Sequence, residues 1–383
     1  RGAPRFWERR VGENAGSPLR RAACTRAIMH GTTKGGCMDN TVYRLLRPGV
    51  FESQVEHIAL EAGQALVRPT FLSICAADQR YWSGRRDPQA LAEKLPMALI
   101  HEAVGTVVED TTGAHEPGAS VVMVPNTPDP DDPDTASKEN YARASKFRSS
   151  GIDGFMSDYV VIASERLVAA EGIDPLVASM GELVSVCCNA VEAFDEVRRV
   201  PRNHTVGIWG DGAVGYLCAA ILRELHPELE LIVFGTHDSK LAKFDFVDAK
   251  HNIRKEFKEG FPAVDHAFEC VGGTGGSTSA IEQIVSCIRP QGVISLMGVS
   301  EQRVPINTRM VLEKGLRLFG SSRSGRADFE RTLALYRDNP WMVDYLRSLV
   351  GTVVTVSSIR DIATAFDSDV RKQMGKTIMK WDM

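Results

Sequence analysis

The sequence contains no apolar run of about 18 residues, which is the length that a membrane-spanning helix needs. It also lacks a strong charge of either sign, since 45 Lys and Arg and 49 Asp and Glu residues leave a formal net charge of −4. This balance gives no indication of nucleic-acid binding. Cysteine is sparse and scattered, and a chain of 383 residues does not need disulfides for stability. The eight cysteines are therefore predicted to be reduced thiols in a cytoplasmic protein.

The first 37 residues differ from the rest in composition. They hold eight Lys or Arg residues and two acidic ones, with no helical or strand period. An Arg-rich, acid-poor N-terminus is also typical of a transit peptide. Because ordered patterning begins abruptly at Thr41, residues 1–37 are predicted to be a disordered leader ahead of Met38 that adds nothing to function.

The length predicts two domains, and the pattern of the chain changes once. From Thr41 to Val124, short apolar runs alternate with Gly and Pro turns, which indicates a β-rich domain. Beyond about Asp174, strands and helices alternate, which predicts an α/β domain with a parallel sheet covered on both faces. The expected elements there are strands at 205–210, 230–234, 264–270, 292–297 and 316–320 and helices at 213–225, 238–244 and 277–288. Helix is predicted at 327–345, and strands that return to the first domain are predicted at 352–354 and 376–380.

A glycine-rich turn lies between the apolar residues 206–209 and a segment of helical spacing at 216–225. A strand, a glycine turn and a helix in this order form the dinucleotide-binding fingerprint, whereas a glycine triplet without these flanks indicates only a turn. The first glycine permits the tight turn, the second lets a pyrophosphate approach, and the third lets the helix pack on the strand. The predicted cofactor contacts here are Gly210, Gly212, Ala213, Val214 and Gly215.

The end of the next strand indicates which nicotinamide cofactor is bound. NAD enzymes place Asp or Glu there, on the ribose 2′-hydroxyl. Here the strand runs into Gly235, Thr236 and His237, and Asp238 comes one turn late. Gly235 leaves space, while Thr236, His237 and Lys240 are placed to contact a 2′-phosphate. This favours NADPH, the alternative being that Lys240 is a solvated helix residue.

Four potential metal ligands lie in the β-rich half and at its edge: Cys75, His101, Glu102 and Glu182. One thiolate, one imidazole and carboxylate oxygens, with room for water or substrate, make the donor set of a catalytic zinc site. Spacing alone does not establish such a site, because the four residues are far apart in the sequence. Taken singly, the cysteine is more often a buried small hydrophobe and the histidine a hydrogen-bonded core residue.

Longer segments carry a resemblance to a known family. From Met38 to its end, the chain is similar to the zinc-dependent medium-chain alcohol and polyol dehydrogenases. The matching segments are Ser-Ile-Cys-Ala-Ala-Asp-Gln-Arg (73–80), His-Glu (101–102), Glu-Leu-Val-Ser-Val (182–186), Trp-Gly-Asp-Gly-Ala-Val-Gly (209–215), Phe-Glu-Cys-Val-Gly-Gly (268–273), Gly-Val-Ile-Ser-Leu-Met-Gly (292–298) and Gly-Lys-Thr-Ile-Met-Lys (375–380). The resemblance implies a split GroES-like catalytic domain at 38–185 and 323–383 around a Rossmann domain at 186–322. It also implies one catalytic zinc ion per chain in the cleft, held by Cys75, His101, Glu102 and Glu182.

Within the family, the chain most resembles ribitol-5-phosphate dehydrogenases, which also act as ribulose-5-phosphate reductases. The distinctive segments are 73–81, 122–128, 147–156, 207–212, 312–315 and 320–325. The resemblance implies NADPH-dependent reduction of D-ribulose 5-phosphate to D-ribitol 5-phosphate. That product feeds CDP-ribitol synthesis for cell-surface polymers such as teichoic acids. A homo-oligomer, and functional coupling to a ribitol-5-phosphate cytidylyltransferase, are also expected.

The sequence departs from the family pattern in three places. Many relatives have Ser or Thr two places after the zinc cysteine, where it starts a proton relay, but Ala77 stands there and cannot relay a proton. The proton must then come from bound water, from Glu102 or Glu182, or from the substrate's own hydroxyls. The usual glycine before His-Glu is Ile100, for which only a packing effect is expected. The four-cysteine lobe that holds a structural zinc in many relatives is absent.

A phosphorylated substrate needs cations, and arginine suits bidentate phosphate binding. Arg80 and Arg148 are predicted to bind the substrate phosphate, with Arg85, Arg86 and Lys146 as further cations in or beside the distinctive segments. Each of these residues alone is more often a surface residue. Two other functions stay open at this point. One is a zinc polyol dehydrogenase that acts on an unphosphorylated sugar, and the other is a non-catalytic NADPH-binding member of the family.

Overall fold

The computed structural model describes residues 37–133, 138–198, 204–257, 260–371 and 375–383. The predicted leader lies outside these residues apart from Cys37. Cys37 is disulfide-bonded, so the prediction of eight reduced thiols is wrong at this position. Cys37 is half-buried and lies directly before the first strand, which begins at Met38. The free thiols are Cys75, Cys187, Cys188, Cys218, Cys270 and Cys287. No described helix is long and apolar enough to cross a membrane.

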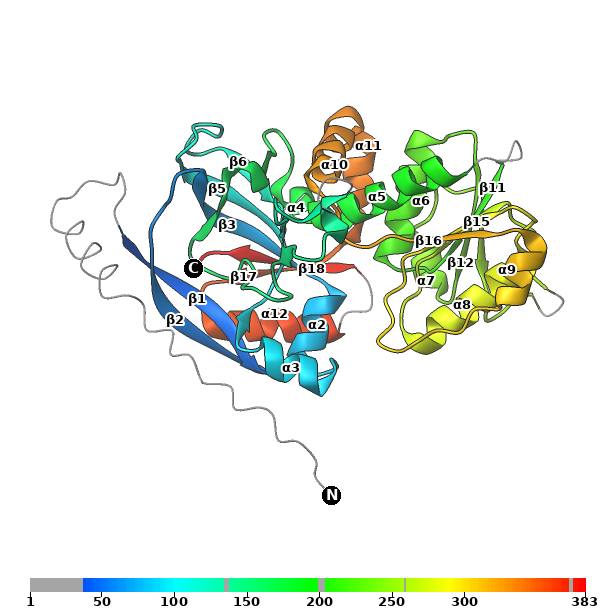
Figure 1. The fold of residues 1–383 in the computed structure, drawn as a ribbon, viewed down its shortest axis with the longest axis horizontal. Helices are drawn as coiled ribbons and strands as arrows, with labels where there is room; N and C mark the ends of the chain where they lie inside the picture. The colour runs from blue at the N-terminus through cyan, green and yellow to red at the C-terminus, as the bar shows by residue number, and fades with distance from the viewer. Residues whose placement is uncertain (1–36, 134–137, 199–203, 258–259, 372–374) are drawn as a thin grey trace, which may run out of the picture.

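The β-rich half is built on two larger sheets, whose strand pairs are antiparallel apart from one parallel pair at the edge (Figure 1). One sheet has the order β2-β1-β4, and the other has the order β10-β6-β5-β3-β18-β17, with β9 also pairing with β3. A short pair, β7-β8, lies apart from both. The strands are β1 (Met38–Arg47), β2 (Val50–Ile58), β3 (Gln64–Ile74), β4 (Met97–Ala98), β5 (Glu102–Asp110), β6 (Ser120–Met123), β7 (Asn126–Thr127), β8 (Lys146–Phe147), β9 (Val160–Ala163) and β10 (Leu167–Ala169).

The last part of the chain adds strands to this half. β18 (Lys376–Trp381) pairs antiparallel with β3 and parallel with β17 (Val350–Val356), as the predicted return of the chain requires. Helix α12 (Ile359–Arg371) joins the two strands and contributes Phe366 to the core of this half, but the sequence reading left it out. The exact domain limits stay a prediction.

The β-rich half also contains two short helices that the alternating pattern concealed. α2 (Ala76–Trp82) follows β3 directly, and α3 (Pro88–Lys94) begins after Asp87, whose carboxylate accepts N–H bonds from Gln89 and Ala90. Asp followed by Pro is a helix-start signal that could have revealed α3. Two 3₁₀ turns, Glu139–Tyr141 and Ser164–Arg166, complete this half.

The second half has the expected parallel α/β architecture. Its six strands lie in the order β13-β12-β11-β14-β15-β16, and every pair is parallel. The order reverses between β11 and β14, and in open sheets of this kind ligands bind at such a switch point. The elements are β11 (Thr205–Trp209), α6 (Ala213–Leu225), β12 (Glu230–Gly235), α7 (Asp238–Leu241), β13 (Ala249–Asn252), β14 (His266–Glu269), α8 (Thr274–Cys287), β15 (Val293–Leu296), α9 (Thr308–Lys314) and β16 (Arg317–Gly320). α6 has the predicted limits, whereas β13 and α9 were not predicted.

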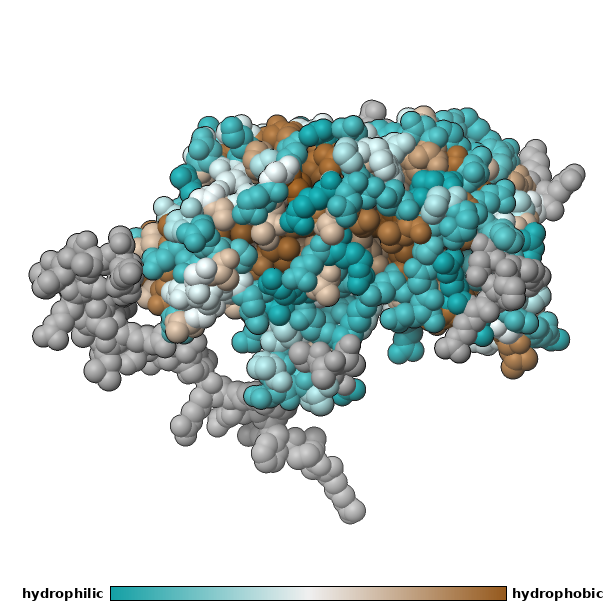
Figure 2. Space-filling view, turned by 90° about the horizontal axis from the view of Figure 1, so that it is seen from above, coloured by the Kyte–Doolittle hydropathy of each residue, from teal (hydrophilic) through white to brown (hydrophobic). Residues whose placement is uncertain are grey.

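Helix α5 (Gly181–Val197) joins the halves, and one apolar core runs from Val122 of β6 through Phe194 of α5 to Leu217 of α6. α4 (Pro175–Ala178) precedes it, and α10 (Arg326–Asp338) and α11 (Pro340–Leu349) pack nearby. The single helix predicted at 327–345 is thus two helices, because a proline at 340 removes a backbone donor and restricts the residue before it. Viewed from above, hydrophobic residues gather in the middle of the molecule between the two ends (Figure 2).

A buried histidine in this sheet gives a pH-dependent stability. His266 is 1% exposed, and its Nδ1 accepts the Val293 N–H at 3.1 Å. Burial lowers the pKa of His266 to about 4. Between that value and the ordinary 6.5, the unfolded chain binds a proton that the folded chain does not, so stability falls as the pH falls. At pH 5 this difference amounts to about 2 kcal/mol.

We therefore expect the wild type to lose about 2 kcal/mol more than His266→Gln between pH 7.5 and pH 5. Urea unfolding at the two pH values measures this difference. Equal losses in the two proteins would show that His266 is not responsible.

Candidate active site between the two halves

The N-terminus of α2 positions the first predicted metal ligand. Cys75 is the N-cap residue, its Sγ accepts the Asp78 N–H at 3.5 Å, and Asp78 Oδ2 accepts the Cys75 N–H at 3.1 Å. Such reciprocal capping fixes both side chains at the start of the helix. The end of β3 and the start of α2 thus place a thiol and a carboxylate together.

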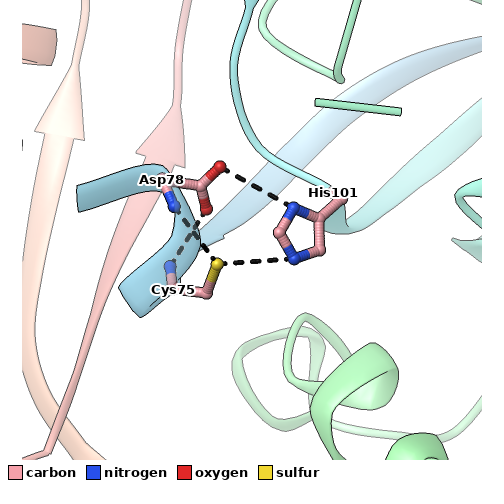
Figure 3. Close-up of side chains that lie close together, drawn as sticks. All are labelled: Cys75, Asp78 and His101. Atoms are coloured by element: carbon pink, nitrogen blue, oxygen red, sulfur yellow. Dashed lines mark hydrogen bonds and ion pairs between the residues drawn. The ribbon is translucent and has the colours of Figure 1, made fainter. Parts of the chain in front are cut away.

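His101 faces this pair from the turn that precedes β5 (Figure 3). Its Nε2 lies 3.4 Å from Cys75 Sγ, and its Nδ1 lies 3.7 Å from Asp78 Oδ1. Asp78 is fully buried and also accepts bonds from the Ile100 N–H at 3.2 Å and the Ser149 hydroxyl at 2.9 Å. This arrangement leaves Nε2 as the ligand atom, with a carboxylate behind the ring. Carboxylate, imidazole and metal are commonly arranged in this order in metalloproteins.

Ile100 has a larger role than the packing effect expected from the sequence. Its φ is +73°, in the left-handed region where a β-branched residue is strained. Such strain costs on the order of 1–3 kcal/mol and persists only where the surroundings enforce it. Here the Ile100 N–H binds Asp78, and its carbonyl accepts the Phe155 N–H at 2.9 Å. Glycine would adopt this backbone without strain, which explains the family pattern in physical terms.

The two predicted glutamates also lie close to His101. The ligand atoms of His101, Glu102 and Glu182 lie within 4.8 Å of one another, as do those of Cys75, Asp78 and His101. The four predicted ligands therefore meet in two overlapping groups that share His101. Asp78 is an additional member that the sequence reading did not single out. The set of one thiol, one imidazole and two carboxylates fits zinc.

Lys376 is a second residue that the sequence reading missed. It is 5% exposed on β18, and its Nζ lies 2.7 Å from both carboxylate oxygens of Glu102, which is fully buried. Burial opposes the charge on Lys376, but Glu102 and Cys75 outweigh that effect and raise its pKa. A lysine in the otherwise apolar Lys-Thr-Ile-Met stretch was the available signal, because a buried charge needs a partner.

Two acidic groups of the site, Cys75 and Glu182, have raised pKa values. Burial raises the pKa of Cys75 well above its ordinary value, and Asp78 and Glu102 raise it further. Burial also raises the pKa of Glu182 to about 7, against an opposing effect of His101. Of the two glutamates, Glu182 is thus the better suited to carry a proton near neutral pH, since Glu102 is paired with Lys376.

The glycine turn forms a cavity at the switch point of the parallel sheet. Gly210 has a φ of +126°, and a Cβ on Gly215 would lie 2.1 Å from the Gly210 carbonyl oxygen, so neither tolerates a side chain. A Cβ on Gly212 would meet nothing within 4 Å, so the space before the helix is open. The cavity has a volume of about 300 Å³, and the predicted cofactor residues Gly210, Gly212, Gly235, Thr236 and Lys240 line it. Ala213, Val214 and Gly215 form the first turn of α6, and the side chain of His237 is 45% exposed beside them.

The predicted phosphate residues occupy different settings. Arg80 Nε lies 3.2 Å from Glu301 Oε1, so it joins α2 to the loop that follows β15. Arg148 instead donates to the carbonyls of Val161 at 2.9 Å and Asp153 at 3.3 Å. These two bonds tie its guanidinium into the β-rich half.

A third arginine, Arg323, comes closer to the metal ligands than the sequence suggested. Its guanidinium lies 4.8 Å from the centroid of the Phe147 ring, which is 5.4 Å from the ring of His101. Burial lowers the pKa of Arg323, and Glu182 acts against that shift. Within the described residues no carboxylate lies within 4 Å of its guanidinium. Arg323 belongs to the distinctive 320–325 segment, which was the signal for it.

Comparison with known proteins gives consistent matches for both halves. Residues 61–172 match the model of the alcohol dehydrogenase GroES-like domain, and residues 176–379 match that of the glucose dehydrogenase C-terminus. The chain is 49% identical to ribulose-5-phosphate reductase 2 of Staphylococcus aureus, across 90% of this chain and 99% of that protein. It is 46% identical to the ribulose-5-phosphate reductase of Bacillus spizizenii, across 90% and 100%. The crystal structure of S. aureus TarJ in complex with NADPH gives a TM-score of 0.79 at 44% identity, across 90% and 100%.

Proposed function

The chain belongs to the zinc-dependent medium-chain alcohol dehydrogenase family, and we propose that it is an NADPH-dependent reductase of D-ribulose 5-phosphate. The product is D-ribitol 5-phosphate, which supplies CDP-ribitol for ribitol-phosphate polymers such as teichoic acids. One observation carries the proposal. The donor set around His101 and the open glycine turn occur together in a chain that matches ribulose-5-phosphate reductases over nearly their whole length.

We assign the metal to Cys75, His101, Glu102 and Glu182. Zinc held there acts as a Lewis acid toward the substrate carbonyl. Asp78 orients the His101 ring, and Lys376 balances the charge of Glu102. When Glu182 is not coordinated to the metal, its carboxyl group would hold and deliver a proton, since Ala77 cannot.

We assign the dinucleotide to the cavity at the glycine turn. The nicotinamide supplies the hydride, while the chain binds and orients it. The first turn of α6 has no side-chain cap, so its N–H groups are available to the pyrophosphate. Thr236, His237 and Lys240 are the donors for the 2′-phosphate.

The substrate phosphate needs a cation that is near the ligands and not already paired. Arg323 meets both conditions within the described residues, whereas Arg80 is paired with Glu301. The guanidinium of Arg148 is bound to two carbonyls, which makes it the weakest of the three candidates. We therefore place the phosphate at Arg323, with Arg80 as a second cation if its contact with Glu301 breaks.

The test follows NADPH oxidation with D-ribulose 5-phosphate, with D-ribulose and NADH as parallel controls. We expect rapid turnover only with the phosphorylated sugar and NADPH. Arg323→Ala should lower kcat/KM for D-ribulose 5-phosphate about 100-fold, because a charge-assisted bidentate contact is worth on the order of 3 kcal/mol. Its matched control is Arg85→Ala, since the Arg85 side chain donates to the Ser83 hydroxyl in an exposed position.

Three results would contradict parts of this proposal. Turnover of D-ribulose at a similar rate would identify a polyol dehydrogenase. If a zinc-loaded protein is inactive with every pair of sugar and cofactor, the family assignment stands but D-ribulose 5-phosphate is not the substrate. Equal activity of Arg323→Ala and Arg85→Ala would exclude Arg323 from the phosphate site.

A homo-oligomer and a cytoplasmic location belong to the same proposal. β16 pairs with β15 on one side only within the described residues, and Leu312 nearby is 79% exposed. A free strand edge is a ready surface for a second copy. Light scattering that finds a monomer, or fractionation that finds the protein outside the cytoplasm, would contradict these points. If the chain works together with a ribitol-5-phosphate cytidylyltransferase, adding that enzyme and CTP should consume the product of the reductase.

A further inference from the structure

The aspartate inside the glycine turn makes contacts that its sequence position did not suggest. Asp211 Oδ2 accepts the backbone N–H groups of Thr236 at 2.7 Å and His237 at 2.8 Å. His237 Nδ1 lies 3.1 Å from the same oxygen, and Lys240 Nζ lies 3.8 Å from Oδ1. The carboxylate from one loop thus binds the end of the neighbouring strand.

The packing keeps Asp211 in this place. Its side chain is 10% exposed, and a Cβ on Gly235 would lie 2.7 Å from Asp211 Cβ. Glycine at 235 therefore leaves room for the carboxylate as well as for a cofactor. Burial works against the charge of Asp211, but the bonds from Thr236 and His237 outweigh it and lower the pKa. Asp211 is consequently an anion at neutral pH.

The groups that surround Asp211 are the ones assigned to the 2′-phosphate of NADPH. Thr236, His237 and Lys240 are together two backbone donors, one imidazole and one ammonium, and all of them are already directed at Asp211. Two anions within a few ångströms repel strongly in a partly buried site. A 2′-hydroxyl, by contrast, carries no charge and can donate to a carboxylate, as it does to the acidic residue of NAD enzymes.

We propose that Asp211 is a specificity-determining residue that competes with the 2′-phosphate for Thr236, His237 and Lys240. The inference rests on the proposed NADPH site. With NADPH the phosphate takes over these donors and the Asp211 carboxylate turns away from them. With NADH the carboxylate stays and accepts the ribose 2′-hydroxyl. Thr236, His237 and Lys240 favour NADPH over NADH, and Asp211 therefore reduces the difference between the two affinities.

The test measures dissociation constants for NADPH, NADH and 2′,5′-ADP by fluorescence quenching and calorimetry, without turnover. Asp211→Asn keeps the size and an acceptor oxygen but removes the charge. We expect it to bind NADPH and 2′,5′-ADP at least 10-fold more tightly and NADH no more tightly than the wild type. Lys240→Met should bind NADPH more weakly than the wild type, and its dissociation constant for NADH should be unchanged.

Asp238→Asn is the matched control, because Asp238 lies just beyond His237 but contacts Asn252 and Lys255. It should leave all three constants unchanged. If Asp211→Asn binds NADPH no more tightly, or weakens NADPH and NADH equally, Asp211 only organises the loop and the inference is wrong. Wild-type protein that binds NADH but neither NADPH nor 2′,5′-ADP would overturn the proposed cofactor as well. If the dissociation constants are as expected but the protein is inactive toward D-ribulose 5-phosphate, only the proposed substrate is wrong.

Discussion

Cys75→Ser is expected to lose its zinc on purification and to lower kcat/KM by about 1,000-fold or more. Lewis-acid stabilisation of a developing oxyanion contributes several kcal/mol, and each 1.36 kcal/mol corresponds to about tenfold in rate. A hydroxyl does not ionise as a thiol does at a metal, so serine removes the soft anionic ligand. It also keeps a side-chain acceptor for the Asp78 N–H at the start of α2, so the helix should remain capped.

The measurement is metal content by mass spectrometry together with steady-state kinetics. Cys287→Ser is the matched control, because Cys287 lies at the end of α8, where its Sγ donates to the Ile284 carbonyl and packs against the core of the parallel-sheet half. It should retain zinc and activity. Full zinc occupancy in Cys75→Ser, or equal activity of the two variants, would exclude Cys75 as a ligand.

The sequence was sufficient for features that depend on local patterns. The limits of α6 followed from helical spacing and a breaker, and the parallel alternation followed from the order of apolar runs. The metal donors were named because a thiol, an imidazole and carboxylates stand in motifs of a known family. The structure then brought His101 close to the thiol and to both carboxylates.

The remaining features depend on contacts between distant parts of the chain. Lys376 and Glu102 are 274 positions apart, so no spacing rule could pair them. The contact of Asp211 with the end of β12 likewise requires the register of the parallel sheet. Ile100 shows a different limit, because a positive φ at a β-branched residue is imposed by its neighbours and contradicts local preference. Short helices such as α2 were missed because about two turns carry too little periodicity.

Lys376→Met is expected to destabilise the metal-free protein by about 3–5 kcal/mol. Removing one partner of a buried ion pair leaves the other charge without compensation, and such changes typically have this cost. Lys376 and Glu102 form such a buried ion pair, because both side chains are buried and the two N–O distances are 2.7 Å. The effect exceeds that of a surface pair, which contributes at most about 1 kcal/mol.

A double-mutant cycle separates the interaction energy of Lys376 with Glu102 from the packing contribution of each side chain. Lys376→Met combined with Glu102→Gln should recover most of the loss, because no buried charge is then left unpaired. Lys380→Met on the same strand is the matched control, since Lys380 is exposed and should change stability by no more than about 0.5 kcal/mol. Chemical unfolding of the chelator-treated proteins measures the stability of the wild type, the two single variants, the double variant and the control. Additive losses in the double variant would mean that the two residues do not stabilise one another. Recovery would show that the lysine compensates the buried carboxylate of Glu102 next to His101.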